Sequence, residues 1–81
     1  MDPSIRQALD DYFRESEQKA YLMAIALTHS HHDALELVQD SMLKLVQKYQ
    51  HRDADEWGPL FYRILQNAIR DWFRKQKFRQ V

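Results

Sequence analysis

The apolar residues of the chain recur at intervals of three and four positions, which is the period of an α-helix with one buried face. A first run spans residues 5–13 and follows Asp2-Pro3, which supplies an N-cap acceptor and a proline suited to the first helical position. A second run spans residues 20–27. The polar stretch between them, residues 14–18, contains no glycine or proline and predicts either a kink or a short break.

A polar boundary over residues 28–33 separates these runs from a further helix. Ser30, with Asp33 three positions later, fits a capping box in which aspartate replaces the more usual glutamate. The helix is predicted to run to about Tyr49. Its predicted buried face consists of Ala34, Leu35, Val38, Met42, Leu45, Val46 and Tyr49.

A polar, charged loop is predicted over residues 50–55, and a last helix follows it. Asp53 or Asp55 is suited to cap that helix, and Gly58-Pro59 is expected to disturb its first turn. Its predicted buried face consists of Phe61, Ile64, Leu65, Ala68 and Trp72. The helical segments together predict an all-α fold, a compact bundle of three or four helices.

The composition narrows the class of protein. A chain of 81 residues has room for a single domain, and its one glycine and two prolines argue against a turn-rich β protein. The absence of cysteine excludes a disulfide scaffold, a zinc finger and a thiol nucleophile, and it favours the cytoplasm over a secreted setting. No apolar run approaches the roughly 20 residues needed to span a bilayer. The N-terminus also lacks the basic flank and apolar core of a signal peptide, so no membrane insertion is expected.

The charges of the chain cancel in total but are unevenly distributed. Residues 1–57 carry six lysines and arginines against eleven aspartates and glutamates, a net charge of −5, whereas residues 58–81 carry six against one, a net charge of +5. Such a split favours two surfaces with different partners, nucleic acid for the basic part and protein for the acidic part. The alternative is that the opposite charges attract one another within the fold.

One face of the last predicted helix is basic. Opposite its apolar positions lie Arg63, Asn67, Arg70, Arg74 and Lys77. Nearby are aromatic residues that the core does not need in full, namely Trp57, Tyr62, Phe73 and Phe78. Basic groups that follow phosphates, together with rings on which bases stack, are typical of single-stranded nucleic-acid binding, and the Asn67 amide is able to read a base edge. The alternative is a solvated helix face whose aromatic residues cap the bundle.

The solvent side of the helix before it is rich in acceptors: Asp33, Glu36, Gln39 and Asp40. Without a glycine-rich phosphate loop or a histidine ligand at suitable spacing, this pattern indicates a protein-docking patch or a plain solvated face rather than a catalytic pair. The histidines His29, His31, His32 and His51 lie at helix boundaries and in the loop. They are interpreted as polar boundary residues, so neither a metal site nor another cofactor is predicted.

Two blocks of the sequence resemble a family of bacterial transcription factors. Residues 32–45, HDALELVQDSMLKL, resemble the D-A-x-D/E-L-V-Q-E/D-x-F-L-x-L segment in region 2 of sigma-70 family sigma factors, in particular of the extracytoplasmic-function (ECF) type. Residues 61–75, FYRILQNAIRDWFRK, are similar to the L-Y-R-I-A-x-N-x-x-x-D-x-x-R-R segment of the same region. The blocks stand in the order of the family, and the resemblance covers roughly residues 5–79.

The resemblance implies a sigma region 2 domain, which is not an enzyme and needs no cofactor. The helix of the first block would bind the clamp coiled coil of the β′ subunit of core RNA polymerase. The residues to which this role would fall are Asp33, Glu36, Leu37, Gln39, Asp40 and Leu43.

The second block, with the preceding loop at residues 50–56, would melt the promoter −10 element and hold a flipped base of the non-template DNA strand. The positions that match the family motif are Tyr62, Arg63, Asn67, Arg70 and Arg74, to which the basic, aromatic pattern adds Trp57 and Lys77. An anti-sigma factor is a further partner implied by the resemblance.

The chain also departs from the family pattern. Trp57 and Leu60 stand where the family often has phenylalanine and tryptophan, and Gly58-Pro59 stands where it has polar or small residues. The family's second domain, a helix-turn-helix that reads the −35 element, is missing, and residues 74–81 resemble the start of the linker to it, so the chain is expected to be a fragment. Two alternatives are a helical adaptor or anti-sigma-like regulator that binds only protein, and a small metal-dependent enzyme using Asp33, Glu36 and Asp40.

Overall fold

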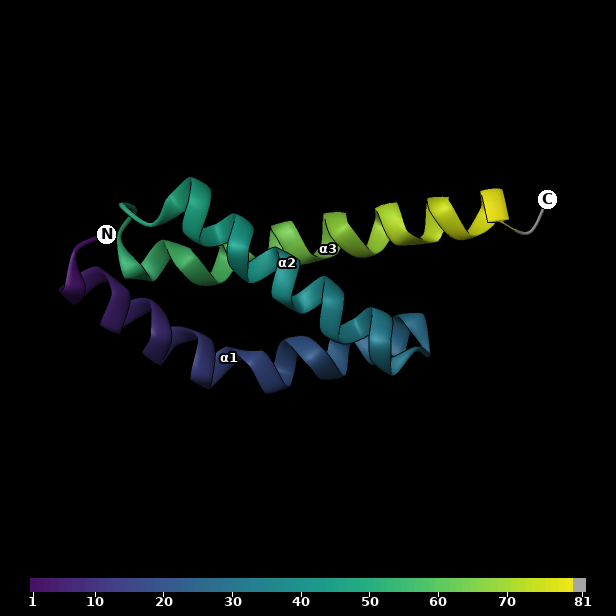
Figure 1. Ribbon diagram of the computed structural model, residues 1–81, viewed down its shortest axis with the longest axis horizontal. Helices are drawn as coiled ribbons and strands as arrows, with labels where there is room; N and C mark the ends of the chain where they lie inside the picture. Colours follow the sequence, from purple (N-terminus) through teal and green to yellow (C-terminus); the bar gives the residue numbers. More distant parts are fainter. Residues whose placement is uncertain (80–81) are drawn as a thin grey trace.

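A computed structural model describes residues 1–79 of the chain, which form three helices and no strand. These are α1 (Pro3–Thr28), α2 (His31–Tyr49) and α3 (Ala54–Arg79) (Figure 1). The prediction of an all-α bundle of three or four helices is therefore confirmed, with three. Of the segment expected to start a linker, residues 74–79 continue α3, and residues 80–81 lie outside the described residues.

The first helix begins as its sequence predicts. The Asp2 side chain accepts a hydrogen bond from the Ser4 backbone N–H at 2.9 Å, and Pro3 is the first helical residue. The two apolar runs belong to one helix, because α1 continues without a break through residues 14–18. Arginine, glutamate and glutamine in that stretch are good helix formers, so nothing in it terminates the helix. The helix ends at His29, which has a left-handed backbone (φ 55°) and donates its N–H to the Ile25 carbonyl.

The start of α2 contains half of the predicted capping box. The Ser30 hydroxyl oxygen accepts a hydrogen bond from the Asp33 backbone N–H at 3.3 Å. The return bond is absent, because the Ser30 N–H donates to the Thr28 hydroxyl and the Asp33 carboxylate accepts a hydrogen bond from Trp72. The capping-box expectation is therefore correct for Ser30 and wrong for the Asp33 side chain.

The buried face of α2 is narrower than its apolar pattern. Its buried residues are Ala34, Val38, Ser41 and Leu45, whereas Leu35 is 40% exposed, contrary to the prediction. Leu35 lies at the edge of the face that α1 and α3 cover, so its side chain reaches solvent. Ser41 occupies the core position instead, because its hydroxyl donates to the Leu37 carbonyl at 2.7 Å and so brings no unpaired polar group into the core.

The third helix includes both residues that were expected to disturb it. At its start, the Glu56 N–H donates a hydrogen bond to the Asp53 carbonyl, and the helix then runs through Gly58 and Pro59. Because Pro59 lies close to the helix start, the carbonyl that loses its partner is near the solvated end of the helix. Beyond it, Phe61, Leu65 and Ile69 are buried, while the predicted core residues Ile64, Ala68 and Trp72 are only half-buried.

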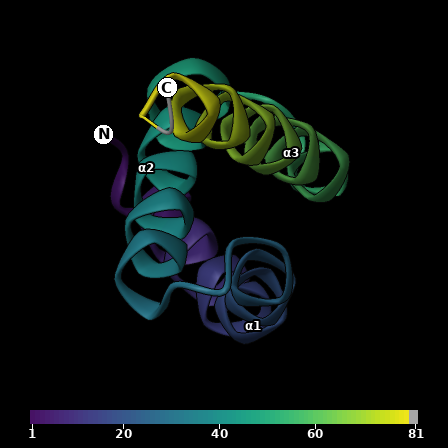
Figure 2. The same ribbon diagram turned by 90° about the vertical axis from the view of Figure 1, so that its right-hand side faces the viewer.

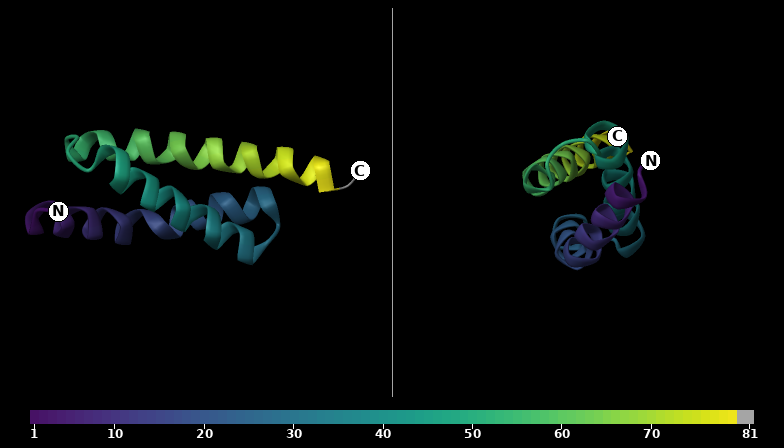
Figure 3. Two further views of the ribbon diagram at one scale, coloured as in Figure 1. Left: turned by 45° about the horizontal axis from the view of Figure 1, so that its top comes forward. Right: turned by 90° about the vertical axis from the view of Figure 1, so that its left-hand side faces the viewer.

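The three helices pack so that α2 runs diagonally between α1 and α3 (Figure 1). Figure 2 shows α1 and α3 lying beside α2, and Figure 3 shows that the C-terminal part of α3 points away from the end at which the chain begins. An aromatic cluster joins α1 to α3, in which Tyr12 and Phe13 meet Trp57 and Phe61 with ring centroids about 6 Å apart. This cluster holds the N-terminal half of α3 against α1 and leaves the rest of α3 free to present its outer faces.

The aromatic cluster contains one unsatisfied polar atom, the Tyr12 hydroxyl, which is buried without a hydrogen-bond partner. Burial raises the pKa of Tyr12 above its ordinary value of 10.0. This effect outweighs the lowering of the pKa by the nearby Ser16 hydroxyl, whose contact with Tyr12 falls short of a hydrogen bond. We expect Tyr12→Phe to raise the free energy of unfolding by about 1 kcal/mol, since a buried unpaired hydroxyl costs about 1–3 kcal/mol. Urea unfolding at pH 7 measures the change.

The same substitution makes a prediction about pH. Because the folded-state pKa of Tyr12 lies above the unfolded value, the unfolded chain loses this proton first, and the protein is destabilised as the pH rises above about 10. The phenylalanine variant is expected to lose less stability between pH 9 and pH 11 than the parent. A variant less stable than the parent at pH 7 would show that the hydroxyl has a partner in solution.

Candidate nucleic-acid and protein-binding surfaces

The basic stripe of α3, which we define as Arg63, Asn67, Arg70, Arg74 and Lys77, is exposed along its whole length. It lies on the side of the helix opposite the buried Phe61, Leu65 and Ile69, as the spacing predicted. One member is paired: the Arg74 guanidinium donates to the Asp71 carboxylate and holds the pKa of that carboxyl below its ordinary range. From Arg63 to Lys77 the stripe extends for about 21 Å along the helix, enough to follow several phosphates of one strand.

The aromatic residues near the basic stripe fall into two groups. Phe73 and Phe78 are 44% and 83% exposed, and Tyr62 is half-buried, so these rings are accessible as expected. Trp57 is different: it is 4% exposed, and its indole N–H donates to the Tyr49 carbonyl at 3.2 Å. The expectation that the core leaves Trp57 free is therefore wrong, because a ring buried in the aromatic cluster cannot stack on a base while the core stays closed.

The acidic face of α2, which we define as Asp33, Glu36, Leu37, Gln39, Asp40 and Leu43, is a second, separate surface. Glu36, Gln39 and Asp40 are exposed, and the Leu43 side chain beside them is 55% exposed. Asp33 and Leu37 are half-buried. An exposed leucine among carboxylates and an amide gives an apolar centre with a polar rim, which is the anatomy of a protein-docking surface.

A groove of about 260 Å³ separates part of the acidic face from α3. Asp33, Glu36, Leu37, Asp40 and Lys44 line it from α2, and Ala68, Asp71, Trp72, Lys75 and Gln76 line it from α3. At one point the two walls are joined, because the Trp72 indole N–H donates to the Asp33 carboxylate at 3.0 Å. This hydrogen bond links the start of α2 to the C-terminal half of α3 and fixes the positions of the two surfaces relative to each other.

The Asp33–Trp72 hydrogen bond was not predicted from the sequence. Asp33 was predicted to cap α2 and to bind polymerase, and Trp72 was predicted to lie in the core. A signal for it was present. A tryptophan at the edge of an apolar face needs an acceptor for its indole N–H, and a carboxylate at the start of a neighbouring helix is a suitable one.

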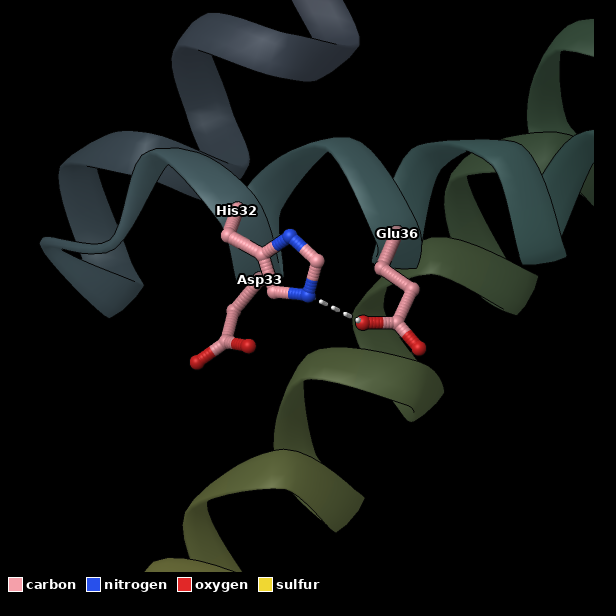
Figure 4. Close-up of side chains that lie close together, drawn as sticks. All are labelled: His32, Asp33 and Glu36. Carbon is pink, nitrogen blue, oxygen red and sulfur yellow. Dashed lines mark ion pairs between the residues drawn. The ribbon is translucent and has the colours of Figure 1, made fainter.

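The start of α2 also brings His32, Asp33 and Glu36 together (Figure 4). The His32 imidazole nitrogen Nε2 lies 3.3 Å from the Glu36 carboxylate, and one ligand atom from each of the three residues lies within 4.8 Å of the others. Such a set could offer one nitrogen and two oxygens to a divalent metal. The sequence analysis found no histidine at suitable spacing from these carboxylates, and this was wrong, because Glu36 follows His32 by four positions. Both side chains of the pair are largely exposed, and their attraction alone accounts for their approach.

The chain is thus a small all-α domain with one basic and one acidic surface. A family model described as Sigma-70 region 2 matches residues 12–79, and the chain therefore belongs to this family. Comparisons with curated proteins and with solved structures gave no match. Membership gives the chain a sigma-factor role in binding RNA polymerase and recognising promoter DNA, as a transcription-factor domain that is not an enzyme.

Among residues 1–79, no helix is both long enough and apolar enough to cross a bilayer.

Proposed function

We propose that the chain is region 2 of an ECF-type sigma factor. The acidic face of α2 binds the clamp coiled coil of the polymerase β′ subunit, and the basic stripe of α3 holds the non-template strand of the −10 element in single-stranded form. The observation that carries the proposal is the separation of the two surfaces. An exposed row of cations lies on the outer side of α3, and an exposed acceptor-rich surface with Leu43 in it lies on α2. One small domain can therefore bind a protein and a nucleic acid at once.

The DNA half of the proposal is supported by the chemistry of the outer side of α3. Flipping a base costs a few kcal/mol, so the protein must offer stacking and phosphate contacts in return. Arg63, Arg70, Arg74 and Lys77 supply the cations, and the half-buried Tyr62 supplies a ring fixed by the core. Asn67 lies among the cations, where its amide can read a base edge. We leave Trp57 out of this surface because of its burial.

The loop before α3 belongs to the proposed base-binding region. In residues 50–56, Arg52 lies 3.4 Å from the Glu56 carboxylate and its guanidinium is 5.8 Å from the centre of the Tyr49 ring. These contacts hold the loop against the end of α2 and the start of α3. In the proposal, this fixed loop forms part of the surface that receives a base that has left its stack.

The polymerase half is supported by the acidic face, which the Asp33–Trp72 hydrogen bond holds in a fixed position relative to α3. Because this bond ties α2 to α3, polymerase that binds the acidic face also sets the direction of the basic stripe. The proposal places the chain in the bacterial cytoplasm, where promoter DNA and core polymerase are found. It also includes an anti-sigma factor as a partner that would cover one or both surfaces.

A comparison of single-stranded with double-stranded DNA tests the proposed mode of DNA binding. We expect the chain to bind a single-stranded oligonucleotide at least tenfold more tightly than the same sequence as a blunt duplex at 0.1 M salt, because only unpaired bases can stack on Tyr62. Fluorescence anisotropy with a labelled oligonucleotide measures both affinities. Equal affinities for the two forms would mean that the basic stripe binds phosphates of any DNA and that base stacking does not contribute. Failure to bind either DNA at low salt would favour a helical module that binds only protein.

A further inference from the structure

One cation of α1 lies beside the proposed DNA surface. The Lys19 ammonium lies over the Tyr62 ring, 5.7 Å from its centroid, so this contact joins α1 to α3. Lys19 itself is exposed, whereas Tyr62 is half-buried. Among the side chains that the structure describes, those of residues 1–78, the ion pairs are His32–Glu36, Arg52–Glu56 and Arg74–Asp71, and Lys19 takes part in none of them. Its charge is therefore neutralised by no carboxylate in the part of the chain that the structure describes.

The position of Lys19 relative to α3 is specific. Asp71, Trp72 and Lys75 line the groove on the flank of α3 that faces α2. Tyr62 lies on the other flank, where α1 approaches. The two flanks can be followed in Figure 2, in which α1 and α2 lie on different sides of α3. Lys19 therefore extends the positive charge of α3 onto α1, on the side away from the acidic face.

A lysine over an aromatic ring can contribute to single-stranded nucleic-acid binding in two ways: the lysine can contact a phosphate, and the ring can stack on a base. The cation is attracted by the electron-rich face of the ring, which holds the ammonium at the surface without a carboxylate. The flexible four-carbon stem then lets the ammonium move to a phosphate, for which it has a stronger attraction, and this uncovers the ring for a base. Tyr62 and Lys19 together thus contain the two elements that bind one nucleotide.

We propose that Lys19 is a DNA-binding residue, which contacts a backbone phosphate of the strand held by the basic stripe, next to the nucleotide whose base stacks on Tyr62. The inference rests on the proposed DNA-binding function and adds a residue from α1 to a surface otherwise built from α3 and the loop before it. Lys19 lies outside the two sequence blocks that resemble the family, within the acidic N-terminal part of the chain. Only the packing of α1 against α3 brings it to the basic surface.

The test is a salt series of single-stranded DNA binding with Lys19→Met. Methionine keeps an unbranched stem over the Tyr62 ring but carries no charge. For single strands the logarithm of the binding constant falls with the logarithm of salt concentration by about 0.7 for each phosphate contacted. We expect the slope for Lys19→Met to be less negative by about 0.7 and the affinity at 0.1 M salt to fall about fivefold. Lys19→Arg is expected to restore most of the salt dependence and most of the affinity.

The matched control is Arg14→Met, which removes the same charge from another exposed position of α1. Arg14 lies five positions before Lys19, so its side chain leaves the helix on a different side. It is expected to keep the parental slope. Far-UV circular dichroism and melting temperatures verify that all variants are folded. An equal loss in the two variants would mean that only net charge matters, and would overturn the specific contact.

A double-mutant cycle tests the position of the contact. If Lys19 holds the phosphate beside the base on Tyr62, then Lys19→Met is expected to weaken binding less in a Tyr62→Leu background than in the parent. Fully additive effects would overturn that position.

The results also distinguish failure of the Lys19 contact from failure of the proposed DNA-binding function. A changed slope in Arg70→Ala/Arg74→Ala with an unchanged slope in Lys19→Met overturns the role of Lys19 alone. Failure of the parent chain to bind single-stranded DNA overturns both.

Discussion

Replacing Arg70 and Arg74 together by alanine is expected to weaken single-stranded DNA binding by about 25-fold at 0.1 M salt, the product of two phosphate contacts. The slope of the logarithm of the binding constant against the logarithm of salt concentration is expected to become less negative by about 1.4. Both side chains are exposed on the outer side of α3 and contribute nothing to the core, so the fold should not change. Anisotropy titrations between 0.05 and 0.2 M salt, about the range over which phosphate contacts dominate, provide the measurement.

The control for this variant removes the same charge elsewhere. Arg6→Ala/Arg14→Ala deletes two exposed arginines of α1 and leaves the basic stripe intact. We expect its slope to equal that of the parent. If the two double variants lost the same affinity and slope, the chain would be binding DNA through its net charge alone, and the basic stripe would have no specific role.

The second large effect is expected at the acidic face. Gln39→Ala/Asp40→Ala removes two exposed polar side chains next to Leu43 and is expected to weaken binding to core RNA polymerase at least tenfold, or about 1.4 kcal/mol. Single-stranded DNA binding by the isolated chain should be unchanged, because these residues lie on α2. Competition with a known sigma factor for purified bacterial core polymerase measures the first quantity, and anisotropy measures the second.

A matched pair on α1 provides the reference for this variant. Glu17→Ala/Gln18→Ala removes one exposed carboxylate and one exposed amide from adjacent positions, as the acidic-face variant does. It is expected to compete as well as the parent. Parallel loss of polymerase and DNA binding in Gln39→Ala/Asp40→Ala would instead indicate a damaged fold, which a lowered melting temperature would reveal.

The helices could be predicted from the sequence because local signals agreed with the tertiary structure. Asp2-Pro3 and Ser30 mark helix starts with side chains that need only their own backbone neighbours, and both do so in the structure. The errors occur where packing decides. Leu35 is apolar but lies at the edge of the packed face, and Ser41 is polar but satisfies its hydroxyl within its own helix. Neither outcome follows from periodicity.

The basic stripe was predictable for the same reason, because residues on one helix face share a period whatever the helix packs against. The contacts between side chains of different helices were not predictable in this way. Trp57 and Tyr62 are both aromatic residues near the start of α3, yet one is in the core and the other is beside Lys19 at the surface. The Asp33–Trp72 bond likewise joins positions 39 residues apart. Such contacts depend on how α1 and α2 cross α3, which the chain pattern does not specify.

In the proposed function, the separation of the two surfaces lets one short chain bind DNA and polymerase at the same time. Carboxylates on the proposed DNA surface would repel phosphates. Asp71 lines the groove that faces α2, and its carboxylate contacts the stripe only at Arg74, with which it is paired. The acidic face in turn leaves its carboxylates free of the α3 arginines that form the stripe. Separation of charge within 81 residues therefore prevents the two surfaces from neutralising each other.

The most direct test of these separate roles is the formation of a ternary complex of the chain, core RNA polymerase and a labelled single-stranded oligonucleotide, followed by native gel electrophoresis. We predict that the parent chain brings the oligonucleotide to polymerase. Arg70→Ala/Arg74→Ala should form the polymerase complex without the oligonucleotide, and Gln39→Ala/Asp40→Ala should bind the oligonucleotide without polymerase. Displacement of the oligonucleotide from the parent chain by polymerase would contradict the proposal, because it would mean that both partners compete for one surface.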